Sequence, residues 1–322
     1  MHIRSEKGAF MRTNVKSKRD TRQSAGQAAK RRDTGKTVGI IAVILSAIIF
    51  GIAPTIVTLT FSGGNSGMNA AFLRSLIILP GIYTAVLIKK IPLKVSRAEL
   101  KDLILCIGVG QGITSVLLSG SYDFIPVSVA TPVHFVYPVA AAVLGRMLWR
   151  EKLNKAKLLA LALCAAGVVC FFEKDGAIAW QGIAMALISG FTFAFYLQYL
   201  GRSSLAEMPL LKLLFYTNLI SCAVAGIVCA ACRSITFSLT AGAWANMILA
   251  SLMISVTGTV LLQFGTRIIG GLTSAICSTF EPIFSVLCGV IVLGESVSTI
   301  KLLGSVLILL SILCITLLSK EG

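Results

Sequence analysis

The amino-acid sequence predicts an all-α membrane protein with ten transmembrane helices, arranged as two inverted repeats of five helices each. The first observation is composition: 56% of the 322 residues are hydrophobic, only 13% are charged, and the mean hydropathy is +0.88, which is typical of membrane proteins. The second is a succession of apolar segments close to the roughly 20 residues that cross a bilayer. The third is a pattern of residues that recurs 144 positions later.

The net charge of +16 lies mostly outside the apolar segments. Eleven of the 29 Lys and Arg residues fall in residues 1–36, which are polar and lack hydrophobic periodicity, so we expect a disordered, basic cytoplasmic tail. We interpret this tail as a solvated segment that helps to fix topology, with contact to anionic lipids as the alternative. Because the basic residues form no stripe on the surface of a folded soluble domain, the net charge does not indicate a nucleic-acid partner.

Residues 37–173 are predicted to form the first five-helix repeat, and residues 177–318 the second. The predicted spans are 37–60, 68–88, 100–120, 127–149, 155–173, 177–200, 209–231, 243–266, 271–294 and 300–318. The loops after the second and fourth spans are rich in Lys and Arg, whereas the loops on the opposite side carry few positive charges. By the positive-inside rule, both termini are therefore expected to be cytoplasmic.

The repeated pattern is clearest in the fourth and ninth spans. Pro282 and Glu295 in the ninth span correspond to Pro138 and Glu151 in the fourth span, 144 positions earlier. Five spans are an odd number, so the second copy must enter the membrane in the opposite orientation. Such a pair of halves can exchange inward-facing and outward-facing roles, which favours a secondary transporter that works by alternating access.

Glu281 is the most informative candidate residue, because a carboxylate near the bilayer centre costs about 3 kcal/mol on insertion scales. Its counterpart in the first copy is Tyr137, so both side chains are expected near the midplane, facing the substrate. We expect Glu281 to face a water-filled cavity and to titrate or to pair during transport, with a proton as the candidate coupling ion. The alternative is a structural hydrogen-bonding role, with Pro138 and Pro282 acting as simple kinks.

Arg74 is another charge well inside an apolar segment, and it needs an anion, a carboxylate or carbonyl groups nearby unless it reaches the interface. An Arg74–Glu281 contact is one option. The further candidates for substrate binding are polar or aromatic groups within the spans: Gln111, His134, Tyr196 and Gln263. Glu151 and Glu295, at the ends of the fourth and ninth spans, are predicted to act with the two prolines as caps or hinges.

The sequence carries no pattern typical of an enzyme, a metal protein or a cofactor-binding protein. The nine cysteines lie in apolar surroundings and are interpreted as packing residues. We expect no metal, no cofactor and no catalytic residue, because no ligand cluster, nucleotide-binding loop or activated nucleophile is present. A receptor is a weaker interpretation, since a sizeable soluble domain is lacking.

With these residues in view, the chain resembles the drug/metabolite transporter superfamily, in particular its EamA-type branch. The resemblance rests on residues 272–297, with Glu281-Pro282 and Gly294-Glu295, and on residues 128–153, which depart from the family pattern at Arg150. It implies a multi-pass secondary carrier of the plasma (inner) membrane that exports amino acids, metabolites or drugs. A lipid-linked amphiphile translocase is the alternative. A homodimer is left open.

Overall fold

The computed structural model describes residues 35–150, 155–170, 179–293 and 299–318. Every regular element in these ranges is a helix, so the all-α prediction is confirmed. Six helices are long and apolar enough to cross a membrane: Gly35–Gly63, Gly67–Ile88, Arg97–Ser121, Trp180–Leu200, Leu210–Ala231 and Ala241–Ile269. The chain is therefore a multi-pass membrane protein. Ten continuous membrane helices are not shown within the described ranges.

The elements follow one another along the chain in two matching series. The first helix (residues 35–58) precedes η1 (Phe61–Gly63), α2 (Gly67–Ile88), α3 (Arg97–Asp102), η2 (Leu103–Gly112), α4 (Ile113–Ser121), α5 (Val127–His134), α6 (Tyr137–Trp149) and α7 (Lys155–Val169). The second series comprises α8 (Trp180–Leu200), η3 (Ser204–Ala206), α9 (Leu210–Ala231), α10 (Ala241–Ala250), η4 (Ser251–Gly258), α11 (Thr259–Ile269), α12 (Gly271–Cys277), η5 (Ser278–Phe280), α13 (Glu281–Leu293) and α14 (Thr299–Leu318). The helices α3, α6 and α7 begin 144 positions before α10, α13 and α14.

The fourth and ninth predicted spans are each broken in the middle. The fourth consists of α5 and α6, separated by a turn at Phe135 and Val136, and the ninth consists of α12, the 3₁₀ turn η5 and α13. A proline causes each break, because its ring lacks an N–H group and clashes with the carbonyl four residues earlier. Pro138 and Pro282 are both the second residue of the helix that follows the break. Glu281 therefore begins a helix rather than lying inside one.

Two π-helical stretches occupy matching places in the two series. η2 joins α3 to α4, and η4 joins α10 to α11, so each forms the middle of a continuous membrane helix. The carbonyls of η4 receive extra donors: Ser46 Oγ donates to Gly258 O at 2.9 Å and Asn218 Nδ2 donates to Ser255 O at 3.1 Å. π-helical turns are rare and recur at functional sites, and both stretches lie beside the interior of the bundle.

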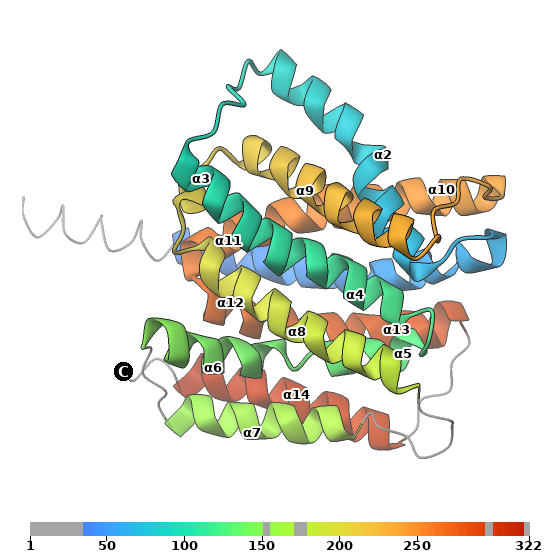
Figure 1. Cartoon of the computed structure of the whole chain (residues 1–322). Helices are drawn as coiled ribbons and strands as arrows, with labels where there is room; N and C mark the ends of the chain where they lie inside the picture. The colour runs from blue at the N-terminus through green and yellow to red at the C-terminus, as the bar shows by residue number, and fades with distance from the viewer. Residues whose placement is uncertain (1–34, 151–154, 171–178, 294–298, 319–322) are drawn as a thin grey trace, which may run out of the picture.

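Matching helices of the two series pack against each other at the edges of the bundle. α2 lies along α9 on one side, and α7 lies along α14 on the other (Figure 1). Between these pairs, the first helix, η2, α6, α8, α11 and α12 contribute side chains to the main core, and α4 and α5 pack against α8. The interior between the two series is therefore formed by the broken spans and their neighbours.

Polar contacts cross between the two series at the end of the bundle where α3 begins and α11 ends. Tyr199 Oη donates to Asp102 at 2.8 Å, and the Ser204 amide and hydroxyl donate to the same carboxylate at 2.8 and 2.7 Å. Lys212 forms an ion pair with Glu99 at 3.4 Å and donates to the Lys94 carbonyl at 2.7 Å. These contacts join α3 to the second series.

Two of the predicted hinge residues, Glu151 and Glu295, lie outside the described residues. The structure therefore describes only Pro138 and Pro282 among the predicted hinges, and it places both at helix breaks. The helix predicted at 243–266 extends to Ile269 and so includes Arg267.

Gly51 on the first helix tests the packing at the break before α13. A Cβ atom at this position would lie 2.5 Å from the Glu281 carbonyl oxygen and 2.8 Å from the Phe284 Cβ. We expect Gly51→Ala to lower the free energy of unfolding by about 1–3 kcal/mol, because neither neighbour can yield easily. Thermal unfolding of the purified chain in detergent measures the change.

Gly81→Ala on α2 is the matched control, since nothing lies within 4 Å of its added Cβ. This variant should unfold at the wild-type temperature or slightly above it, because alanine is the better helix former. Equal stability of the two variants would contradict the close packing of the first helix on Glu281.

Candidate functional site

A pocket of about 610 Å³, including its open mouth, lies among the first helix, α2, η2, α4, α5, α8, η4 and α13. Four of the predicted substrate-binding residues line it: Arg74, Gln111, His134 and Glu281. The remaining lining residues are Phe50, Pro54, Val57, Thr114, Ser115, Leu118, Ser119, Tyr122, Phe193 and Ile254. Six of these fourteen lining residues are apolar and eight carry a polar or charged side chain, so the pocket combines apolar walls with polar groups that can orient a small molecule.

Arg74 enters the pocket from α2 and is half-buried. Its Nη2 atom donates a hydrogen bond to the Ser115 hydroxyl on α4, which fixes the guanidinium at the pocket wall. A guanidinium carries five N–H donors in a planar fork, so this single bond leaves donors for an oxygen-bearing ligand. Arg74 is held by a neutral partner.

Glu281 enters from the start of α13 and is only 5% exposed. Among the described residues, none pairs with this carboxylate or with the Arg74 guanidinium within the 4.0 Å limit of an ion pair. The predicted option of a direct Arg74–Glu281 contact is therefore not observed. Both ionisable groups face the same space without neutralising each other directly.

His134 is the last residue of α5 and lies 3% exposed beside the pocket. Its Nδ1 atom lies 2.8 Å from the Ser189 hydroxyl oxygen, and that hydroxyl donates its proton to the Ala186 carbonyl at 2.6 Å. A hydroxyl has one proton to donate, so we assign the Nδ1–H tautomer to a neutral His134. Its Nε2 atom is then an acceptor available to a ligand.

Gln111 belongs to the π-helical stretch η2, and its Oε1 atom is buried without a hydrogen-bond partner among the described residues. Beside it, Thr114 donates to the Gly110 carbonyl at 2.6 Å and lies 2.6 Å from the Thr192 hydroxyl on α8. An unpaired amide oxygen in a pocket wall can accept a hydrogen bond from a ligand.

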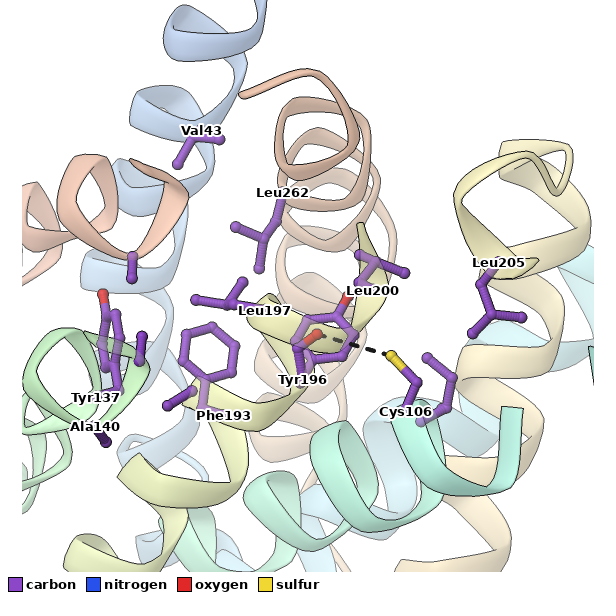
Figure 2. Packing of buried hydrophobic residues seen from close by; sticks show 14 of the residues in the cluster. Val43, Cys106, Tyr137, Ala140, Phe193, Tyr196, Leu197, Leu200, Leu205 and Leu262 are labelled. Carbon is purple, nitrogen blue, oxygen red and sulfur yellow. Dashed lines mark hydrogen bonds between the residues drawn. The ribbon is translucent and has the colours of Figure 1, made fainter. Parts of the chain in front are cut away.

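Tyr137, Tyr196 and Gln263 are not among the residues that line the pocket. Tyr137 and Tyr196 are 0% exposed and belong to the main core, on either side of Phe193 (Figure 2). The centroid of the Phe193 ring lies 5.0 Å from the centroid of the Tyr137 ring and 5.9 Å from that of the Tyr196 ring. The expected symmetry of Tyr137 and Glu281 is thus absent in this conformation: the carboxylate faces the pocket and the phenol packs behind it.

The comparisons with known proteins address the whole chain. The sequence matches the model of the EamA-like transporter family over residues 37–172 and again over residues 180–317. The chain belongs to the EamA-like transporter family. The resemblance predicted from residues 128–153 and 272–297 is therefore confirmed.

Relatives of this EamA-like chain are distant. It is 25% identical over 205 residues to the uncharacterized transporter sll1319 of Synechocystis sp. (strain ATCC 27184 / PCC 6803 / Kazusa), and the match covers 61% of each protein. The chain thus spans about 61% of the length of this curated relative. A solved crystal structure of a protein matches with a TM-score of 0.66 and 17% identity, covering 89% of this chain and 99% of that chain. This second likeness shows the fold alone.

Tyr122 and the serines of α4 are pocket residues that were not predicted from the sequence of this EamA-like chain. Tyr122 falls in a predicted loop, because its neighbours Tyr-Asp-Phe-Ile-Pro are typical of a turn, whereas it caps α4 and lines the pocket. Ser115 and Ser119 share its helix face at spacings of four and three residues. This helical spacing is the sequence signal that could have identified the three residues as one polar face of α4. No group of three metal-ligating side chains occurs in the described part of the chain.

The His134–Ser189 hydrogen bond makes a testable contribution to stability. Ser189→Ala leaves the buried His134 Nδ1–H without its acceptor, so we expect the free energy of unfolding to fall by about 1–3 kcal/mol. Chemical or thermal unfolding in detergent measures the loss. In a His134→Phe background, the same serine change should have less than half that effect, because no imidazole remains to be satisfied.

Ser62→Ala is a suitable control, since Ser62 is exposed at the end of the bundle. Its effect should stay within about 0.5 kcal/mol. If the serine change at position 189 were equally costly with and without His134, the His134–Ser189 hydrogen bond would make no net contribution to stability.

Proposed function

We propose that this chain is a secondary transporter that exports small organic solutes by alternating access. The observation that carries the proposal is the pair of uncompensated ionisable groups, Arg74 and Glu281, facing one pocket inside a membrane-spanning bundle. Charged groups at membrane depth are costly, and they mark substrate and ion pathways. The family match supports transport as the activity.

Alternating access is supported by the opposite directions of matching helices. In Figure 1 the chain runs from α5 to α6 in one direction and from α12 to α13 in the other, and the continuous helices α3–η2–α4 and α10–η4–α11 are also opposed. Inverted halves let a carrier change its open side by exchanging the roles of the two repeats. Pro138 and Pro282, at the broken spans, are the proposed hinges.

The chemistry of the pocket suggests the kind of solute. The guanidinium of Arg74 suits a carboxylate, while Glu281, the Gln111 Oε1 atom and the His134 Nε2 atom are acceptors for an ammonium or hydroxyl group. Phe50, Phe193 and Ile254 offer apolar contact between them. We propose a small solute with an acidic group and a hydrogen-bond donor, such as an amino acid or a related metabolite.

The proposed setting is the plasma (inner) membrane, with both termini in the cytoplasm. The first helix starts at the same end of the bundle as the basic loop between α2 and α3, and α14 ends there too (Figure 1). The contacts of Asp102 and Lys212 link the two series at that end. The pocket extends along α4 towards Tyr122, at the opposite end, which is consistent with an outward-facing conformation.

Glu281 is the proposed site of proton coupling. Glu281→Gln keeps the shape of the side chain but removes its ability to exchange a proton, so flux should lose its dependence on pH while the chain still folds. Flux of a labelled amino-acid mixture in proteoliposomes, measured with and without an imposed pH gradient, tests this.

Glu207→Gln is the control, because Glu207 is exposed and remote from the pocket residues. It should retain the wild-type response to the gradient. Full pH-dependent flux in the Glu281 variant would rule out coupling through this carboxylate.

Arg74 is the proposed anchor for the acidic group of the solute. Arg74→Lys keeps the positive charge but loses the planar fork, so the apparent affinity for carboxylated solutes should fall about tenfold or more, as expected for a lost charge-assisted hydrogen bond. Affinity for a matched amide should change little. Competition assays with each carboxylate and its amide separate the two effects.

The exposed Arg97 on α3 provides the control substitution Arg97→Lys, which should leave both affinities unchanged. If Arg74→Lys lowered the affinities for the carboxylate and the amide equally, Arg74 would have only a structural role in the pocket.

A further inference from the structure

A second set of unpaired polar groups lies behind the pocket, where α8 meets α11. The Thr266 Oγ1 atom and the Nε and Nη2 atoms of Arg267 are buried with no hydrogen-bond partner in the described part of the chain, and the neighbouring Tyr196 Oη and Gln263 Oε1 atoms have none of good geometry. Tyr196, Gln263 and Thr266 are each 0% exposed. Leaving one such group unpaired costs about 1–3 kcal/mol, so a cluster of them calls for an explanation.

Arg267 shows what kind of ligand would fit. Its Nη1 atom donates to the Met208 carbonyl at 2.7 Å, which anchors the guanidinium at one corner. The two unpaired atoms, Nε and Nη2, form the side of the guanidinium whose N–H bonds run parallel. That edge matches the two oxygens of a carboxylate in a bidentate contact. Among the described residues, no carboxylate lies within ion-pair distance of it.

The neighbouring side chains complete a small polar surface. Gln263, Thr266 and Arg267 follow one another at i, i+3 and i+4 on α11, so they share one helix face. The Tyr196 side chain, from α8, lies close to both Gln263 and Arg267. Gln263 is held in place by its Nε2 atom, which donates to Thr217 on α9 at 2.9 Å.

The repeat relates this surface to the open pocket. Ser119 and Tyr122 line the pocket, and the residues 144 positions later are Gln263 and Thr266. Phe193 separates the two regions, because its ring lines the pocket and also stacks on Tyr196, with the centroids 5.9 Å apart and the planes at 25° (Figure 2). The same face of the corresponding helix is thus exposed to the pocket in one half and enclosed in the other.

We infer that the groups around Arg267 form a second binding site, which receives the carboxylate of the solute and opens at the end of the bundle where the basic loops lie. The inference rests on the proposed transport function and deepens it. A carboxylated solute would meet Arg267 first when it enters from that end, and it would then pass Phe193 to reach Arg74. The site is closed in this conformation, so its polar atoms stay unpaired until the bundle changes its open side.

Sided cysteine labelling tests the site without knowledge of the solute. Thr266→Cys and the control Ser119→Cys, which lies in the open pocket, are introduced into a full-length chain whose nine native cysteines are replaced. Membrane vesicles of each orientation then receive the anionic reagent sulfonatoethyl methanethiosulfonate or the cationic trimethylammonioethyl analogue. The extent of labelling is read from a later mass-tag reaction with the thiols that remain free.

The expected result is labelling of Thr266→Cys from the face with the basic loops, and of Ser119→Cys from the opposite face. At Thr266→Cys, the anionic reagent should react faster than the cationic one by about tenfold, because the guanidinium attracts it at close range. Adding Arg267→Gln should abolish this preference, whereas Arg267→Lys should preserve part of it. Benzoate should slow the anionic labelling, and benzamide should not.

Two outcomes would overturn the inference: no reaction of Thr266→Cys from either face while Ser119→Cys reacts, or a preference for the anionic reagent that survives Arg267→Gln. If Thr266→Cys does not fold, Gln263→Cys takes its place, since it shares the same helix face. A failure of the proposed function would look different. The labelling pattern would then be present while the reconstituted wild-type chain moved no solute.

Discussion

The two prolines that interrupt membrane-spanning segments are the constraint on which the interior of this protein depends. A backbone carbonyl in hydrocarbon must find a partner or a protected place, and Pro138 and Pro282 each remove one helical donor. The chain tolerates the breaks because helices pack closely over them. Gly190 on α8 lies against the His134 carbonyl, which Pro138 leaves without its helical donor, and an added Cβ there would come within 2.6 Å of that oxygen. At the second break, the Ser278 carbonyl accepts from the Glu281 amide instead. The breaks in turn place a histidine and a glutamate at helix ends, beside the pocket.

The electrostatic character of the interior follows from this arrangement. Arg74, Glu281 and Arg267 are half-buried or buried, and in the described part of the chain none of them pairs with an opposite charge. A structural ion pair would satisfy two of these groups at once, yet neutral partners hold the arginines: a serine hydroxyl for Arg74 and a backbone carbonyl for Arg267. Interior charges kept apart in this way are available to something that comes and goes.

Much of the fold could be predicted from the sequence, because the length and hydrophobicity of a segment largely determine whether it can cross a bilayer. The polar pocket residues Arg74, Gln111, His134 and Glu281 could also be identified, because polar side chains are costly inside such apolar segments. Kinks or hinges were predicted at Pro138 and Pro282, but the full interruption of the two helices and the π-helical stretches were not, since the backbone there depends on contacts between helices. Tyr137 shows the limit most clearly: the repeat makes it equivalent to Glu281, but one conformation treats the two halves differently. Tyr122 and Arg267 were missed because both lie just beyond the predicted ends of their helices.

The position of Phe193 bears on the leakage of water and solute through the bundle. One aromatic ring borders the open pocket on one side and stacks on Tyr196 of the enclosed cluster on the other. In this structure the ring therefore fills the space between the pocket and the cluster. A water molecule or solute that passed directly from one to the other would have to displace this single side chain.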